Sequence, residues 1–174
     1  MEQKQLRDLL EQLQRGSLDV EAVLSKLPPP AVVDIEYAHV DLHRRERCGF
    51  PEVIFCEGKT PEWVAGVVKQ LIGAGQHCLA TRVNEAQAVF LAEEFPDGQQ
   101  DRIARTFWLP AGAISEPIGK VMVITAGTSD LPVAREAVVT ASSQGCNVEL
   151  IADVGVAGIH RLLRHRERFA GADV

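Results

Sequence analysis

The run Lys120-Val121-Met122-Val123-Ile124-Thr125-Ala126 is the strongest indication of the fold in this chain. It is a continuous apolar run, which is typical of a parallel strand buried on both faces. The turn Gly127 to Asp130 follows it and leads into a helical pattern from Pro132 to Gln144. A second strand pattern, Asn147 to Ala152, and a helix from about Val156 to Phe169 come next. This alternation predicts the opening of a doubly wound parallel sheet.

The first loop after these strands has the chemistry of an anion site. Ligands of doubly wound sheets bind outside the carboxyl ends of the strands, where Gly127 to Asp130 falls. Gly127 permits a sharp turn, Thr128 and Ser129 offer hydroxyl and amide groups, and the next helix offers free N–H groups. The turn lacks the lysine of a P-loop. A plain turn with Asp130 as the helix cap is therefore an equal alternative.

The second loop, Asp153 to Arg161, follows the next strand and is expected beside the first. Gly155 and Gly158 flank Val156 and Ala157 and permit close approach of a ligand. Arg161 suits bidentate contact with phosphate or carboxylate, and His160 can transfer a proton near neutral pH. Alone, His160 would be read as a structural histidine. Two such loops on adjacent strands favour a binding site.

The segments before Gly119 predict a helical arm and a small α/β unit. Helical spacing covers Glu2 to Leu13 and restarts at Ser17, and three prolines at 28–30 must end it. Thr60 and Asn84 are expected to cap helices reaching Ile72 and Glu94. Strand patterns cover Ala31 to Tyr37, Glu52 to Cys56, His77 to Val83 and Arg102 to Leu109. We therefore predict an arm at 1–30, an α/β domain at 31–118 and a further domain at 119–174, in which 172–174 begin a third strand.

Composition sets the class of protein. The 174 residues include 46% hydrophobic and 24% charged residues, which excludes a disordered chain. A net charge of −6 disfavours nucleic acid as a partner. No apolar run is long enough to cross a membrane and no signal peptide is evident, so we expect a cytoplasmic protein. Residues 119–174 carry equal numbers of acidic and basic side chains, which indicates a boundary near Gly112 to Gly119.

The four cysteines carry no recognisable site by their spacing. They show no paired Cys-x-x-Cys pattern and no histidine at metal-finger spacing, so four reduced thiols are expected. Cys48 stands beside Arg47, which would favour its thiolate, but no base is placed next to it. The cysteines are Cys48, Cys56, Cys78 and Cys146.

A charged stretch, Asp41 to Glu52, carries a second candidate site. His43, Arg44 and Arg47, together with Lys59, would cradle an anionic ligand, although a solvated loop explains the same charges. Arg82 is predicted at a strand end, where an ion pair and a ligand contact are equally good readings. Asp41, His43 and Asp130 are possible ligands of a divalent metal. Their spacing is not diagnostic, so no metal site is assigned.

These segments resemble the LarB family, which builds the nickel-pincer nucleotide cofactor. The resemblance runs from about Leu6 to the last residue, and the strings after the two strands are its most specific part. Thr128-Ser129-Asp130 and Ile159-His160-Arg161 also resemble loops of aminoimidazole ribonucleotide carboxylases. The strings are Asp41 to Arg44 with Arg47, Gly49 to Phe55, Gly58 to Thr60, Ala80 to Val83, Ala126 to Ala134, and Asp153 to Leu163.

The resemblance implies an activity. LarB enzymes add CO2 to C5 of the pyridinium ring of nicotinic acid adenine dinucleotide and hydrolyse its phosphoanhydride. The products are pyridinium-3,5-biscarboxylic acid mononucleotide and AMP. A cysteine thiolate is thought to add to the ring first. The family's cysteine motif matches none of the four cysteines, so the nucleophile is expected beyond Val174 and the chain is expected to be a fragment.

The resemblance also implies a fold and an assembly. The fold is a flavodoxin-like, three-layer parallel sheet, as in aminoimidazole ribonucleotide carboxylases, and related domains form homo-oligomers, often octamers. CO2 is a co-substrate, and no cofactor is required by the residues present. Two alternatives stay open: an aminoimidazole ribonucleotide carboxylase or mutase of purine synthesis, and a non-catalytic nucleotide-binding or assembly module. The N-terminal unit disfavours the purine enzyme, which lacks the string Asp41 to Glu52.

Overall fold

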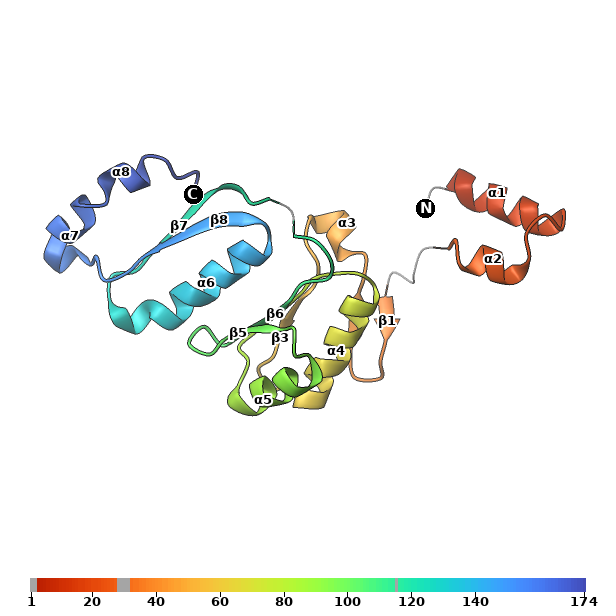
Figure 1. Ribbon diagram of the computed structural model, residues 1–174, viewed down its shortest axis with the longest axis horizontal. Helices are drawn as coiled ribbons and strands as arrows, with labels where there is room; N and C mark the ends of the chain where they lie inside the picture. The colour runs from red at the N-terminus through yellow and green to blue at the C-terminus, as the bar shows by residue number, and fades with distance from the viewer. Residues whose placement is uncertain (1–2, 28–31, 115) are drawn as a thin grey trace. The chain divides into compact units, whose positions relative to one another are not determined.

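The computed structural model describes residues 3–27, 32–114 and 116–174. The chain divides into two compact units, Met1–Ala31 and Val32–Val174, which are treated separately (Figure 1). Helices and both parallel and mixed sheets alternate in the second unit, which confirms the predicted α/β class. No helix in the described ranges is both long enough and apolar enough to cross a membrane.

The first unit is a pair of helices, α1 (Gln3–Gln14) and α2 (Val20–Leu24). The sequence predicted both, but α2 begins later than Ser17. Asp19 is its N-cap, and the Asp19 carboxylate accepts a hydrogen bond from the Ala22 N–H at 2.7 Å. The expected end of this helix at the three prolines lies outside the described residues.

The second unit begins with a hairpin and a four-stranded mixed sheet. Strands β1 (Val32–Asp34) and β2 (His39–Asp41) pair antiparallel, so the single strand expected at 31–37 is wrong beyond Asp34. The four-stranded sheet has the order β3-β4-β6-β5, in which β3 and β4 are parallel and the other pairs are antiparallel. Its strands are β3 (Val53–Phe55), β4 (Cys78–Thr81), β5 (Gln99–Asp101) and β6 (Thr106–Leu109).

Helices α4 (Pro61–Gly73) and α5 (Glu85–Glu94) cover one face of this sheet, and both begin at the predicted caps. The Thr60 hydroxyl accepts from the Trp63 N–H, and Asn84 and Gln87 form a reciprocal capping box. Between helices and sheet lies the hydrophobic core. Its most buried members include Val64, Val68, Leu71, Cys78, Ala80, Leu91 and Phe107.

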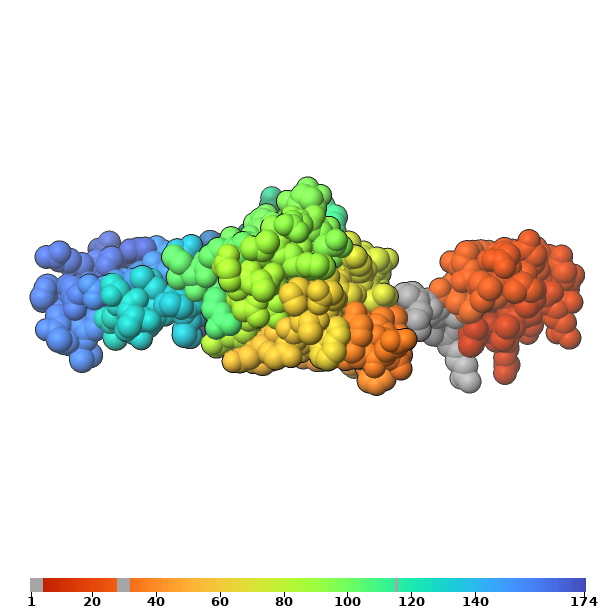
Figure 2. Space-filling view, turned by 90° about the horizontal axis from the view of Figure 1, so that it is seen from below, coloured from red at the N-terminus to blue at the C-terminus, as the bar shows by residue number. Residues whose placement is uncertain are grey.

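The opposite sheet face carries Leu79 and Trp108, which pair across β4 and β6. Helix α6 (Leu131–Ser143) contacts both of these strands. In Figure 2 the cyan atoms of α6 adjoin the green atoms of the sheet region. Two ion pairs tie α6 to this sheet: Arg82 Nε lies 3.2 Å from Glu136 Oε2, and Arg135 Nε lies 2.7 Å from Asp101 Oδ2.

The remaining strands form the predicted parallel pair. β7 (Ile118–Ile124) and β8 (Cys146–Ile151) are parallel and α6 connects them, as in a doubly wound sheet. Residues 172–174 are not a strand, but they run beside β7. The Asp173 N–H donates to the Lys120 carbonyl at 2.8 Å, and the Met122 N–H donates to the Val174 carbonyl at 2.8 Å.

Two other expectations were wrong in detail. The helix expected from Val156 to Phe169 is three short pieces, η2 (Val156–Gly158), α7 (Ile159–Leu163) and α8 (Arg166–Phe169). The strand expected from Arg102 begins only at Thr106. The preceding residues form a turn in which Arg105 has a φ of +55°, a left-handed conformation that a strand does not allow. A short helix, α3 (Arg44–Cys48), also forms within the charged stretch.

Candidate functional site

The loops after β7 and β8 lie side by side, as the parallel pairing requires. The Val154 N–H donates to the Thr125 carbonyl at 3.1 Å, and the Gly155 N–H donates to the Ala126 carbonyl at 3.0 Å. The structure thus brings together the residues expected at Gly127 to Asp130 and Asp153 to Arg161. They form one surface at the carboxyl ends of two parallel strands, where such sheets bind ligands.

Thr125 joins the two loops, and the sequence reasoning did not single it out. Its side chain is buried, and its hydroxyl donates to the Gly127 carbonyl at 3.0 Å and accepts from the Asp153 N–H at 3.3 Å. One hydroxyl therefore fixes the entry of each loop. A polar residue at the end of an otherwise apolar strand was the available signal for this role.

The glycines of the second loop permit its close packing. A Cβ atom at Gly155 would lie 2.9 Å from the Ala126 carbonyl oxygen, so a larger residue would push the loops apart. A Cβ atom at Gly158 would lie 2.7 Å from Arg161 Nε. The two glycines therefore allow backbone and side-chain contacts within the protein, a role distinct from the ligand approach expected of them.

Asp130 turns back into the first loop. Its carboxylate accepts from the Gly127 N–H at 3.2 Å, and the Ser129 hydroxyl lies 3.5 Å from it. It makes no side-chain cap bond to α6, so Asp130 is not the hydrogen-bonding cap that the sequence allowed. Thr128 is exposed on the turn η1 (Thr128–Asp130), which ends where α6 begins. At the start of α6 the Leu131 N–H donates to the Thr128 carbonyl and Pro132 has no N–H, so the polar groups that the loop offers to an anion are those of Thr128 and Ser129.

A cavity of about 430 Å³ adjoins this loop. It runs along the end of β7 and the first turns of α6. Ser129 and Asp130 supply its polar wall, and the apolar wall is mostly small. The apolar lining residues are Val123, Ile124, Ala126, Val133, Ala134 and Ala137.

Arg161 and His160 lie at the start of α7. Arg161 Nη1 donates to Asp153 Oδ2 at 2.6 Å, so its charge is paired within the loop. Asp153 has a φ of +59°, which holds its carboxylate in this arrangement. His160 is exposed, as are Val156 and Ala157 on η2. An anionic ligand would compete with Asp153 for the guanidinium group.

The second proposed cluster does not assemble as expected. Asp41 pairs with Arg47 and its N–H donates to Glu52, which precedes β3. Lys59 follows β3 and donates to the Phe55 carbonyl at 2.6 Å. The strand thus separates Lys59 from Arg47, and the predicted four-residue cradle is wrong.

The other members of this cluster are engaged or exposed. His43 Nδ1 lies 3.8 Å from Glu46, and Arg44 is exposed on α3. Arg47 lowers the pKa of Asp41, so the carboxylate stays ionised. Arg82 makes the ion pair with Glu136 that the sequence allowed as an alternative.

No described set of three or more histidine, cysteine, aspartate or glutamate residues is placed to hold a metal ion. All four cysteines are free, as expected. Burial raises the pKa of the Cys56 thiol to about 11 and also raises the pKa of Cys78. Neither thiol is therefore a ready nucleophile.

Comparisons with known proteins agree with this architecture. Residues 32–111 match the LarB/PurE-like N-terminal domain. An uncharacterized protein of Methanocaldococcus jannaschii is 31% identical over 180 residues, which cover 98% of this chain and 70% of the relative. The aligned region includes both the matched domain and the residues that form β7, β8 and their loops in this chain. The chain therefore belongs to the LarB family, a carboxylase- and mutase-like family of enzymes.

Proposed function

We propose that this protein carboxylates C5 of the pyridinium ring of nicotinic acid adenine dinucleotide and hydrolyses its phosphoanhydride. In the first step a C–CO2 bond replaces the C5–H bond and a proton is released. In the second step water splits the phosphoanhydride into AMP and the mononucleotide. The paired loops after β7 and β8, held by Thr125, carry this proposal because they offer anion-binding groups beside a cavity of about 430 Å³.

The roles of the residues follow from their positions. The hydroxyl and amide groups of Thr128 and Ser129, on the turn before α6, would bind a phosphate or carboxylate group. Arg161 would release Asp153 and bind an anionic oxygen of the ligand instead. The guanidinium group would thus keep one charge-assisted hydrogen bond. His160 is exposed beside Arg161, where its imidazole would serve as a proton donor or acceptor in the reaction.

We also propose that the protein works as a homo-oligomer, with an octamer as the leading assembly. Large apolar side chains around the loops are exposed in the single chain, which is typical of surfaces that associate. Among them are Val133, Val156 and Leu163, at 60, 87 and 61%.

The test is incubation of the protein, expressed from its complete gene, with nicotinic acid adenine dinucleotide and labelled bicarbonate. We expect label in a pyridinium product and release of AMP. An Arg161→Gln variant should lose most of both signals, whereas Arg15→Gln, at an exposed pair in the first unit, should lose neither. Absence of label and of AMP in the unaltered protein would contradict the proposal.

A second candidate is carboxylation of an aminoimidazole ribonucleotide. The Ser129-Asp130 and His160-Arg161 pairs favour it, since they resemble loops of purine-pathway carboxylases. Rescue of a carboxylase-deficient strain from purine auxotrophy would support this candidate. Growth only with added purine would dismiss it. If the protein binds the dinucleotide without turnover, it is the non-catalytic binding module.

A further inference from the structure

The interface between α6 and the four-stranded sheet holds a cavity of about 240 Å³. The Trp108 side chain and two valines of α6, Val138 and Val139, supply its apolar walls. Polar groups border it as well: Gln99, Thr106, Ser142 and Ser143. A space of this kind, apolar with a few placed polar groups, is typical of a small-molecule site.

One buried polar group that lines this cavity has no partner among the described residues. The Trp108 indole N–H is buried and makes no hydrogen bond. Thr106, which also lines the cavity, is 3% exposed. Leaving a buried donor unpaired is costly, and native proteins rarely do so. Trp108 and Thr106 lie on one sheet face, two residues apart on β6, where a single ligand can contact both.

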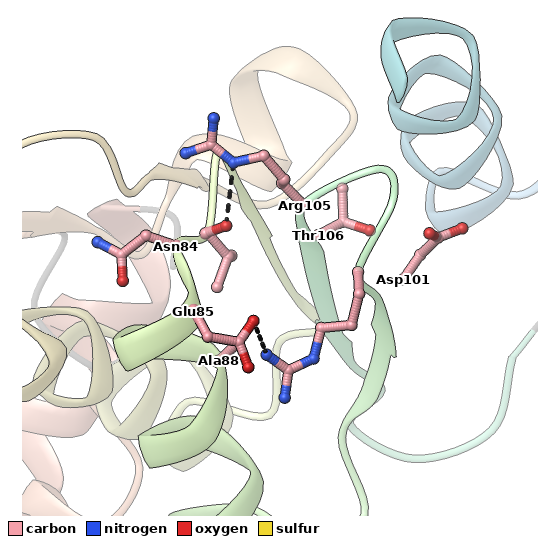
Figure 3. Close-up of a pocket in the computed structure, with 8 residues that line it drawn as sticks. Asn84, Glu85, Ala88, Asp101, Arg105 and Thr106 are labelled. Carbon is pink, nitrogen blue, oxygen red and sulfur yellow. Dashed lines mark hydrogen bonds and ion pairs between the residues drawn. The ribbon is translucent and has the colours of Figure 1, made fainter. Parts of the chain in front are cut away.

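A second cavity of about 290 Å³ adjoins the first, because Asp101 and Thr106 line both. It lies between the start of α5 and the turn before β6, and Glu85, Arg102 and Arg105 are part of its wall. Arg102 Nη1 lies 2.9 Å from Glu85 Oε2. Figure 3 shows Thr106 between Arg105 and Asp101. Arg105 donates to the carbonyls of Val83 and Arg82 at 3.2 Å, which fixes its position without neutralising its charge.

We infer that the joined cavities bind a purine nucleoside monophosphate. The flat base packs against Trp108 and Val138, and a ring nitrogen accepts the indole N–H. The ribose lies at the junction, where Thr106 and Asp101 offer oxygen atoms to its hydroxyl groups. The phosphate lies at Arg102 and Arg105, where it replaces the Glu85 carboxylate as the partner of Arg102, since guanidinium groups bind phosphate through paired N–H donors.

This nucleotide site is separate from the one proposed for catalysis. Val133, Ala134 and Ala137 of α6 line the cavity beside the first loop, whereas Val138, Val139 and Ser142 line the nucleotide cavity. At 100° per residue the mean directions of these two sets differ by about 140°, so they project from different sides of the helix. The nucleotide site therefore goes beyond the proposed function and stands or falls without it.

Trp108 fluorescence provides a direct measurement of binding. The chain has two tryptophans, and Trp63 stacks on Tyr37 away from this cavity, so a Trp63→Phe background leaves Trp108 as the only tryptophan. We expect AMP to quench this emission, with saturation below about 1 mM. Ribose 5-phosphate, which lacks the base, should bind at least about tenfold more weakly. Calorimetry with the unaltered chain should give the same affinity for AMP.

Variants assign the contacts. Arg102→Gln should weaken AMP binding about tenfold, and Thr106→Val, which keeps the shape, about fivefold. Arg102 is exposed, so its replacement should leave the unfolding curve unchanged. Arg161→Gln, in the β8 loop, should bind AMP as tightly as the unaltered chain.

Three outcomes would overturn the inference. The first is that AMP does not bind below millimolar concentration, in which case the cavity holds only water. Arg102→Gln and Thr106→Val both bind like the unaltered chain. Arg161→Gln alone loses binding, which places AMP at the loop site. Only the last of these outcomes bears on the proposed function, and it supports ligand binding there, so the two proposals fail separately.

Discussion

Thr125 couples the two loops through one buried hydroxyl. Thr125→Val keeps the volume but removes the bonds to the Gly127 carbonyl and the Asp153 N–H. We expect the free energy of unfolding to fall by about 1–3 kcal/mol, because both groups lose a partner in a mostly buried place. Urea unfolding measures this change. Turnover should fall in Thr125→Val and persist in Thr125→Ser, which keeps the hydroxyl; equal turnover in both variants would exclude the positioning role.

The cysteines differ in exposure, and this predicts their reactivity. Cys48 is exposed, whereas Cys56 and Cys78 are buried and have raised thiol pKa values. At pH 8 the thiolate fraction of the two buried residues is therefore small in the folded protein. With a thiol reagent under native conditions, we expect Cys48 to react in the fast phase and Cys56 and Cys78 only after unfolding. Cys48→Ser should remove the fast phase; a fast phase that survives would place a reactive thiol elsewhere.

At the scale of elements, the contact between the β7 and β8 loops depends on Gly155. A Cβ atom at Gly155 has no room, since it would lie 2.9 Å from the Ala126 carbonyl oxygen. Gly155→Ala should lower the free energy of unfolding by about 1–3 kcal/mol through overpacking. Gly171→Ala is the matched control, because nothing lies within 4 Å and its φ is not left-handed. Equal urea midpoints for the two variants would refute the tight contact.

Elements with strong local signals could be predicted from the sequence. Thr60 and Asn84 mark their helices because a cap is a property of neighbouring residues. The run from Val121 to Ile124 marks β7 because a continuous apolar run is also a local property of the sequence. Three-residue strands such as β1 and β5 carry little periodicity, so their hairpins were missed. The left-handed φ of Arg105 depends on contacts with Val83, which no local pattern reveals.

Of the candidate sites, too, some could be predicted from the sequence and others only from the structure. Adjacent strands of one parallel pair bring Gly127 and Asp153 into one surface, and their spacing alone predicts this. Arg47 and Lys59 are close in sequence but lie at opposite ends of β3, which only the strand pairing determines. The Trp108 cavity was missed because it forms between α6 and a sheet encoded before it.

At the scale of the whole second unit, the contact between α6 and the sheet depends on pH. Burial opposes ionisation of Asp101, but bonds from the Ala104 N–H and Arg135 outweigh it and lower its pKa. A lowered carboxyl pKa contributes stability above the unfolded value near 4, and this stability is lost as pH falls through the folded value. Asp101→Asn should therefore be less stable than the unaltered chain at pH 6, with a difference that shrinks toward pH 3. A difference independent of pH would contradict this.

The first unit, Met1–Ala31, should be dispensable for the folding of the second. The main hydrophobic cluster draws its residues from Val40 to Leu109, and the sheet ladders lie entirely between Val32 and Ile151. A chain that begins at Val32 should therefore unfold in urea at the midpoint of the full chain, within about 0.5 kcal/mol in free energy, because no side chain of this cluster is removed. Far-UV circular dichroism should show only the loss of α1 and α2. A midpoint shifted by more than this would show that the helical arm stabilises the α/β unit.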